Sequence, residues 1–119
     1  MKEFLATLFI LSVVGTAKSE QQFALMGAGM TSCAEFARAY QKDPVGAGSF
    51  FFSWAQGYMS GINRGPLLNK QPIYNLAARS PIQQQISIAQ YCDERPLASY
   101  VQAVLHLLST LPKVLPQSN

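Results

Sequence analysis

The chain has 119 residues, of which 49% are hydrophobic and only 13% are charged, and its formal net charge is +3. This length supports one compact domain, and the low charge content excludes a disordered acidic or basic tail protein. The nine basic residues are scattered singly along the chain. This argues against nucleic acid as a partner, because nucleic-acid-binding proteins gather their cations on one stripe or patch.

The first segment, residues 1–19, has the order of a secretory signal peptide. Lys2 precedes an almost unbroken apolar run over residues 4–14, and small residues follow this run. The pattern predicts cleavage after Ala17 or after Ser19. This run of eleven residues is too short to cross a bilayer core, which takes about 20. We therefore expect an exported protein, with no membrane span left after cleavage.

Cys33 and Cys92 are the only two cysteines of the chain. In an exported protein an even cysteine count indicates a disulfide, and two cysteines permit a single pairing. Reactive thiol chemistry has no support, because the chain lacks a CxxC motif and its lone histidine, His106, is remote in sequence. We predict a structural bridge that closes a loop of about 60 residues.

Residues 20–31 lack apolar periodicity, and a flexible lead-in is predicted there. A first helix is predicted over residues 33–41, because Ser32 and Glu35 have the spacing of a capping box. The Asp43-Pro44 pair is expected to end this helix, since a residue before proline disfavours helical geometry.

A long second helix is predicted over residues 45–64, because large apolar residues recur at spacings of three and four. These residues are Phe51, Trp54, Tyr58 and Ile62. Trp54 and Tyr58 are interpreted as core residues, with a ligand-binding shelf as the alternative. Gly57 and Gly61 share a four-residue spacing, which predicts that another backbone passes close to them. Asn63 and the Gly65-Pro66 pair are expected to end the helix.

Residues 65–79 break the helical pattern with spaced proline and asparagine residues, so a loop partly attached to the core is predicted. A short helical turn within residues 73–78 is left open. This is the one segment long enough to act as a binding loop, and it is therefore the predicted partner-binding site. Its candidate contact residues are Gly65, Leu67, Leu68, Asn69, Lys70 and Tyr74.

Two further helices complete the predicted fold. The third begins at Ser80-Pro81 with a second capping box. Its expected apolar face consists of Ile82, Ile86, Ala89 and Cys92. The fourth is predicted over residues 96–111, with an apolar stripe of Leu97, Tyr100, Val101, Val104, Leu105 and Leu108. Strand alternation is absent from the sequence, so we expect an all-α bundle of four helices over residues 32–111 and an extended tail at 112–119.

No constellation of residues indicates catalysis or metal binding. The lone histidine, His106, has no carboxylate three or four residues away on its predicted helix that could hold it as a base. A metal site takes three or more His, Cys or carboxylate ligands, and this sequence does not group them. We expect a protein that is not an enzyme and that needs neither metal nor cofactor.

The spacing of several motifs resembles the Rap1a/Tai family of small exported bacterial proteins over residues 32–111. The motif residues are Ser32-Cys33, Trp54, Gly57, Tyr58, Gly61, Asn63, Tyr91-Cys92 and Pro96. The resemblance implies a periplasmic immunity protein that binds a secreted peptidoglycan amidase and blocks its active site through the loop at 65–75. It implies structural roles for the motif residues, and a homodimer is left open.

A looser similarity links the chain to the acid-stress chaperones typified by HdeA, which share a Ser/Thr-Cys helix start and one bridge. A chaperone that opens in acid relies on many carboxylates losing their charge. Only five acidic residues follow Ser19, namely Glu20, Glu35, Asp43, Asp93 and Glu94. This argues against acid triggering, and a periplasmic stress chaperone is the alternative function.

Overall fold

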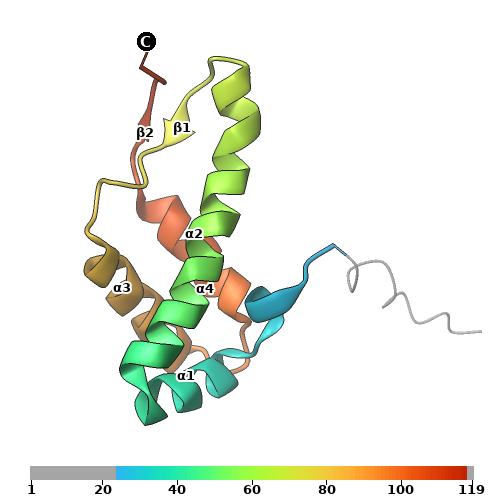
Figure 1. Ribbon diagram of the computed structural model, residues 1–119, viewed down its shortest axis with the longest axis vertical. Helices are drawn as coiled ribbons and strands as arrows, with labels where there is room; N and C mark the ends of the chain where they lie inside the picture. The colour runs from blue at the N-terminus through green and yellow to red at the C-terminus, as the bar shows by residue number, and fades with distance from the viewer. Residues whose placement is uncertain (1–23, 118–119) are drawn as a thin grey trace, which may run out of the picture.

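The computed structural model describes residues 24–117, which form a bundle of helices with one small two-stranded sheet (Figure 1). The helices are α1 (Cys33–Lys42), α2 (Pro44–Leu68), α3 (Pro81–Glu94) and α4 (Tyr100–Thr110). The strands are β1 (Ile73–Tyr74) and β2 (Lys113–Val114), and a 3₁₀ turn, η2 (Gly27–Met30), precedes α1. The predicted all-α bundle of four helices is confirmed. The predicted signal peptide, residues 20–23 and residues 118–119 lie outside the described residues.

Polar caps begin the first three helices, and those of α1 and α3 lie at the predicted residues. Ser32 Oγ accepts a hydrogen bond from the Glu35 backbone N–H at 3.2 Å, and Ser80 forms a full capping box with Gln83. Asp43 ends α1 and also caps α2, where its carboxylate accepts a hydrogen bond from Gly46 N–H at 3.0 Å. One residue therefore separates the two helices, and α2 rises directly from the end of α1 (Figure 1).

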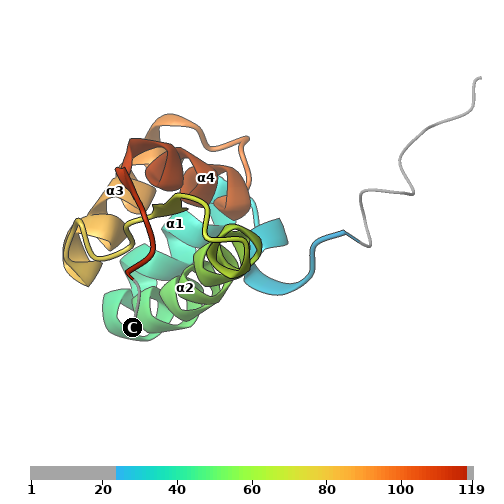
Figure 2. The same cartoon turned by 90° about the horizontal axis from the view of Figure 1, so that it is seen from above.

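The core lies between the four helices. α1 packs against α2 and α3, and α3 packs against α4 (Figure 2). The aromatic rings of Phe36, Phe51 and Tyr100 meet at its centre, with centroids 4.9 to 5.1 Å apart. Burial raises the pKa of the Tyr100 phenol above its ordinary value, because the phenolate would lose its hydration. This cluster joins α1, α2 and α4 in one apolar contact.

The predicted disulfide between Cys33 and Cys92 is present. The two Cα atoms are 4.6 Å apart and both side chains are buried, so the bridge joins the first residue of α1 to the last turn of α3. Backbone hydrogen bonds strengthen this junction, because Cys33 N–H donates to Ala98 O at 2.7 Å and Ala34 N–H donates to Pro96 O at 3.1 Å. The start of α1 is thus held by both the bridge and the α3–α4 connection.

The predicted apolar face of α3 is wrong in part. Ile82 and Ile86 are exposed, whereas Gln84, Ile88 and Cys92 are buried. The disulfide fixes which side of α3 faces α1, and this side carries Ile88 at one helical turn from Cys92. Gln84 enters the same side because its amide donates hydrogen bonds to two backbone carbonyls. Periodicity of apolar residues alone favours a face rotated away from the true one.

The predicted start and stripe of α4 are also wrong in part. α4 begins at Tyr100 rather than at Pro96, because the preceding residues form turns that connect it to α3. Leu97 consequently lies outside the helix and is 99% exposed, and Leu105 is exposed on α4. Ala103 and Leu107, which the predicted stripe omits, are fully buried.

Gly57 and Gly61 do not mark a close backbone approach, contrary to the prediction. A Cβ atom at either position would meet no heavy atom within 4 Å, because this side of α2 is exposed. Close packing occurs instead at Gly29, where a Cβ atom would overlap the Trp54 ring. Trp54 Nε1–H also donates to Met26 O at 3.1 Å. The predicted flexible lead-in is therefore wrong for η2, which packs against α2.

Alanine substitutions at two glycines are expected to change stability in opposite directions. Gly29→Ala should lower the free energy of unfolding by about 1–3 kcal/mol, because the new methyl group overlaps Trp54. Gly61→Ala should raise it by about 0.5–1 kcal/mol, because its methyl group enters open space in a helix interior. Urea unfolding followed by tryptophan fluorescence measures both. A Gly29→Ala variant that is as stable as the wild-type protein would contradict the packing of η2 against α2, and a destabilised Gly61→Ala variant would contradict the open space at Gly61.

Candidate functional site

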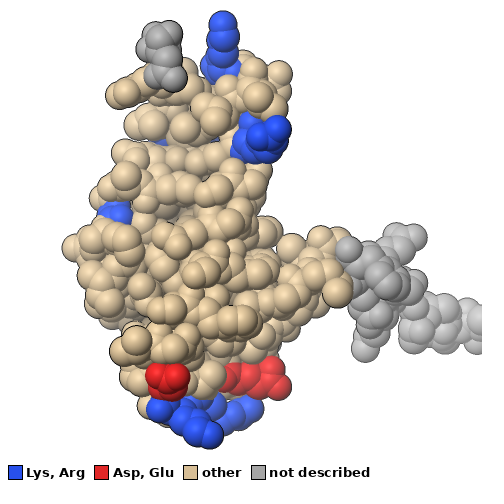
Figure 3. Space-filling model, in the orientation of Figure 1, with Lys and Arg blue, Asp and Glu red and all other residues tan. Residues whose placement is uncertain are grey.

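The end of α2 and the β1–β2 sheet form one end of the molecule, here called the tip (residues 64–74 and 112–115). Four large apolar side chains of the tip are 40% to 70% exposed: Leu67, Leu68, Val114 and Leu115. Three basic residues of the tip are exposed with them: Arg64, Lys70 and Lys113. The four described acidic residues lie on α1, at its C-cap and at the end of α3. Figure 3 shows basic side chains without acidic neighbours at the tip, and acidic and basic side chains together at the opposite end.

The sequence predicts that α2 ends at Asn63 and the Gly65-Pro66 pair. The helix instead continues to Leu68. Pro66 removes only one backbone donor, close to the end of a helix that is already long. Asn63 does not terminate the helix because its side chain is engaged with β1. Its Nδ2 donates to Tyr74 O and its Oδ1 accepts from Tyr74 N–H, both at 2.9 Å.

The two strands hold the tip together. β1 and β2 pair antiparallel, with Ile73 opposite Val114 and Tyr74 opposite Lys113. Lys113 Nζ lies 4.8 Å from the centroid of the Tyr74 ring, a cation–π contact. Because Asn63 binds the backbone of Tyr74, the sheet is attached to α2, and the predicted extended tail is a strand at residues 113–114.

α2 ends in a Schellman motif. Lys70 N–H donates to Leu67 O at 3.2 Å, and Gln71 N–H donates to Pro66 O at 2.8 Å. The motif requires a left-handed residue, and Lys70 occupies that position with a φ of 53°. Glycine or asparagine usually stands there, since a side chain in this conformation costs about 1 kcal/mol. A lysine that lowers stability on an exposed apolar end is typical of a functional site.

Lys70→Gly is therefore expected to raise the free energy of unfolding by about 1 kcal/mol, because glycine adopts a positive φ without strain. If the tip binds a partner, as predicted for residues 65–74, the same change should weaken that binding, because it removes one of the three cations there. Urea unfolding and titration calorimetry measure the two effects. Lys70→Ala is a matched control, since alanine also removes the cation but keeps the strain of a side chain at a φ of 53°. A stabilised variant with unchanged partner affinity would contradict a binding role for Lys70.

The predicted partner-binding residues all lie in the tip, although the segment is not the predicted loop. Gly65, Leu67 and Leu68 form the last turn of α2, Asn69 and Lys70 form its cap, and Tyr74 is half-buried in β1. The tip also contains Arg64, Lys113, Val114 and Leu115, which no pattern in the sequence indicates as binding residues. The run from Lys113 to Leu115 lies between Pro112 and Pro116, and it is too short to show strand periodicity.

The other residues singled out from the sequence lie away from the tip. His106 is exposed on α4, and its ring centroid is 5.0 Å from that of Tyr91. Tyr91 also lies under the Arg95 guanidinium, at 4.5 Å. Trp54 stacks on Tyr58 with centroids 5.0 Å apart, and both rings pack against the core.

Residues 24–117 contain no group of three or more His, Cys, Asp or Glu side chains that could hold a metal ion. In the same part of the chain no helix has both the length and the apolar character that a membrane span needs. Comparisons with family models, curated proteins and solved structures found no match to this chain. Fold and site together define a small helical protein that is closed by one disulfide and has one apolar and basic end.

Proposed function

We propose that this protein is an exported binding protein that attaches to a partner protein through its tip. The observation that carries this proposal is the group of four exposed apolar side chains next to three cations at one end of the molecule. Large apolar side chains that are exposed together mark interaction sites. The buried disulfide supports an oxidising compartment, for which the bacterial periplasm is the proposed place.

The anchoring of the tip supports binding with little rearrangement. Asn63 attaches β1 to α2, β1 pairs with β2, and Asn75 N–H donates to Pro112 O at 2.8 Å. A surface that is already ordered loses little conformational entropy when it binds. The cations indicate an acidic rim on the partner, and the exposed leucines indicate an apolar cleft within that rim.

The specific function that we propose follows the resemblance to the Rap1a/Tai family. The partner is then a secreted peptidoglycan amidase, and the tip enters its active-site cleft and excludes substrate. The shape of the molecule supports this role, because α2 and the strands extend beyond the other helices (Figure 1). A protruding end can enter a cleft that a flat helical face would only cover.

An inhibition assay tests this function. A secreted amidase encoded beside the gene for this chain is incubated with purified peptidoglycan, and release of stem peptides is followed with increasing amounts of the oxidised protein. We expect activity to fall to zero once about one equivalent of the protein is present, because a tight one-to-one complex leaves no active site open. Full activity in a large excess of the protein would contradict the proposed function.

A further inference from the structure

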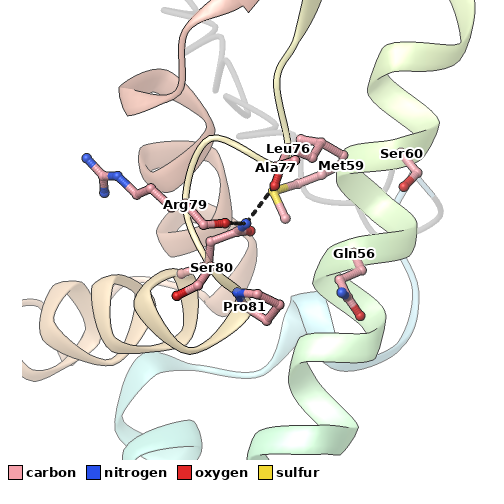
Figure 4. A pocket seen from close by; sticks show the side chains of 9 residues that line it. Gln56, Met59, Ser60, Leu76, Ala77, Arg79, Ser80 and Pro81 are labelled. Atoms are coloured by element: carbon pink, nitrogen blue, oxygen red, sulfur yellow. Dashed lines mark hydrogen bonds between the residues drawn. The ribbon is translucent and has the colours of Figure 1, made fainter.

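A pocket of about 440 Å³ lies between α2 and the segment that joins β1 to α3 (Figure 4). α2 contributes Gln56, Met59 and Ser60, and the joining segment contributes Leu76 and Ala77. None of the residues that line it belongs to the tip. Small-molecule sites usually have volumes of roughly 300–1,000 Å³, so this pocket has the size of a ligand site.

Gln84 of α3 lines this pocket and is only 4% exposed, which is unusual for a glutamine. Its Nε2 donates to Leu76 O at 2.7 Å and to Arg79 O at 2.9 Å. These two bonds use both amide hydrogens, and they fix which atom of the amide is oxygen. No described residue donates a hydrogen bond to Oε1.

The free Oε1 atom keeps some solvent-accessible surface, and Gln84 is one of the residues that line the pocket. Within residues 24–117, no fully buried side-chain nitrogen or oxygen lacks a hydrogen-bond partner. Since Oε1 accepts no hydrogen bond from these residues, it is not sealed in the interior. A ligand that covers Oε1 without donating a hydrogen bond to it would lose about 1–3 kcal/mol of binding free energy. The Oε1 atom therefore favours ligands that carry a hydrogen-bond donor.

The remaining walls of the pocket are apolar or neutral. Met59 is fully buried, and Leu76 and Pro81 add further apolar surface. Arg79 is the one charged residue of the lining, and Figure 4 shows its guanidinium directed away from α2. The pocket therefore offers no charge to balance an ion, and a charged ligand would be desolvated without compensation.

From this geometry we infer that the pocket binds a small neutral molecule with an apolar body and one N–H or O–H donor. The apolar body contacts Met59 and Leu76, and the donor forms a hydrogen bond with Gln84 Oε1. This inference does not depend on the proposed function, because the pocket and the tip share no residue.

N-phenylnaphthylamine is a suitable probe, because it is neutral and apolar, carries one N–H donor and fluoresces strongly in apolar surroundings. We expect saturable binding to the oxidised full-length protein, with a shift of the Gln84 side-chain amide signals in ¹H–¹⁵N spectra. The N-methylated probe, which lacks the donor, should bind about tenfold more weakly. This comparison tests Oε1 without a substitution at Gln84, which would also release the joining segment.

Two tryptophan variants test the location. Ala77→Trp fills the pocket and should abolish probe binding, whereas Ala78→Trp, at an exposed neighbour outside the lining, should leave it unchanged. Circular dichroism shows whether both variants are folded. Equal affinity of the two probes would overturn the role of Gln84 Oε1. Undiminished binding to folded Ala77→Trp, or no binding to the wild-type protein, would overturn the site.

Discussion

Removal of the disulfide by the double substitution Cys33→Ala and Cys92→Ala is expected to lower the free energy of unfolding by about 4 kcal/mol. The two cysteines are 59 residues apart, so the bridge removes a large share of the conformational freedom of the unfolded chain. This loss is comparable to the total stability of a small domain. Alanine is chosen because both side chains are buried, where a serine hydroxyl would add an unpaired polar group.

Urea unfolding followed by circular dichroism measures this loss. The wild-type protein in a reducing agent should match the double variant, and the reducing agent should leave the variant itself unchanged. This control separates the bridge from the small loss of side-chain volume. A double variant within about 1 kcal/mol of the oxidised protein would contradict a stabilising role for the bridge.

Leu68→Glu is expected to weaken attachment of the partner by about 100-fold. Leu68 is 67% exposed at the end of α2, and a carboxylate there would face the apolar cleft and the acidic rim that we propose for the partner. Leu97→Glu is the matched control, because Leu97 is 99% exposed in the α3–α4 connection, outside the tip. Calorimetric titration with the amidase measures both affinities.

The two glutamate variants should have nearly unchanged thermal stability, since both leucines are exposed. A difference in affinity therefore reports on the binding surface and not on folding. Equal affinities for the two variants would remove the tip from the interface. A stronger loss in Leu97→Glu would move the interface to the α3–α4 connection.

Much of the fold is predictable from local signals in the sequence. Ser32 and Ser80 act within a few residues of the helices that they cap, so their effect is visible in the chain itself. The Cys33–Cys92 pairing follows from a cysteine count of two. The caps depend only on neighbouring residues, and a chain with two cysteines leaves one possible pairing.

The errors fall where distant segments decide the outcome. Gln84 is buried because carbonyls of the joining segment accept its hydrogen bonds, and no helical periodicity can indicate that. Asn63 has the appearance of a helix terminator, yet its side chain binds Tyr74 across the tip. Gly29, rather than Gly57 or Gly61, is the close-packing glycine, because Trp54 lies over it.

The position of the candidate site along the chain was predictable, but its secondary structure and its second strand were not. The exposed Leu67, Leu68 and Lys70 lie within the segment that the sequence marks as a binding loop. The strand that completes the tip comes from residues 113–114, which are remote in sequence and show no signal of their own. The left-handed conformation of Lys70 likewise follows from the end of α2 at Leu68, which the sequence does not predict.

Mass spectrometry of the protein isolated from the cells that make it naturally, with free thiols blocked at lysis, tests most directly whether it acts outside the cytoplasm. We predict a chain that begins after Ala17 or Ser19 and carries no blocking group, because Cys33 and Cys92 are joined. A full-length chain with two blocked thiols would contradict export and, with it, the proposed encounter with a cell-wall hydrolase.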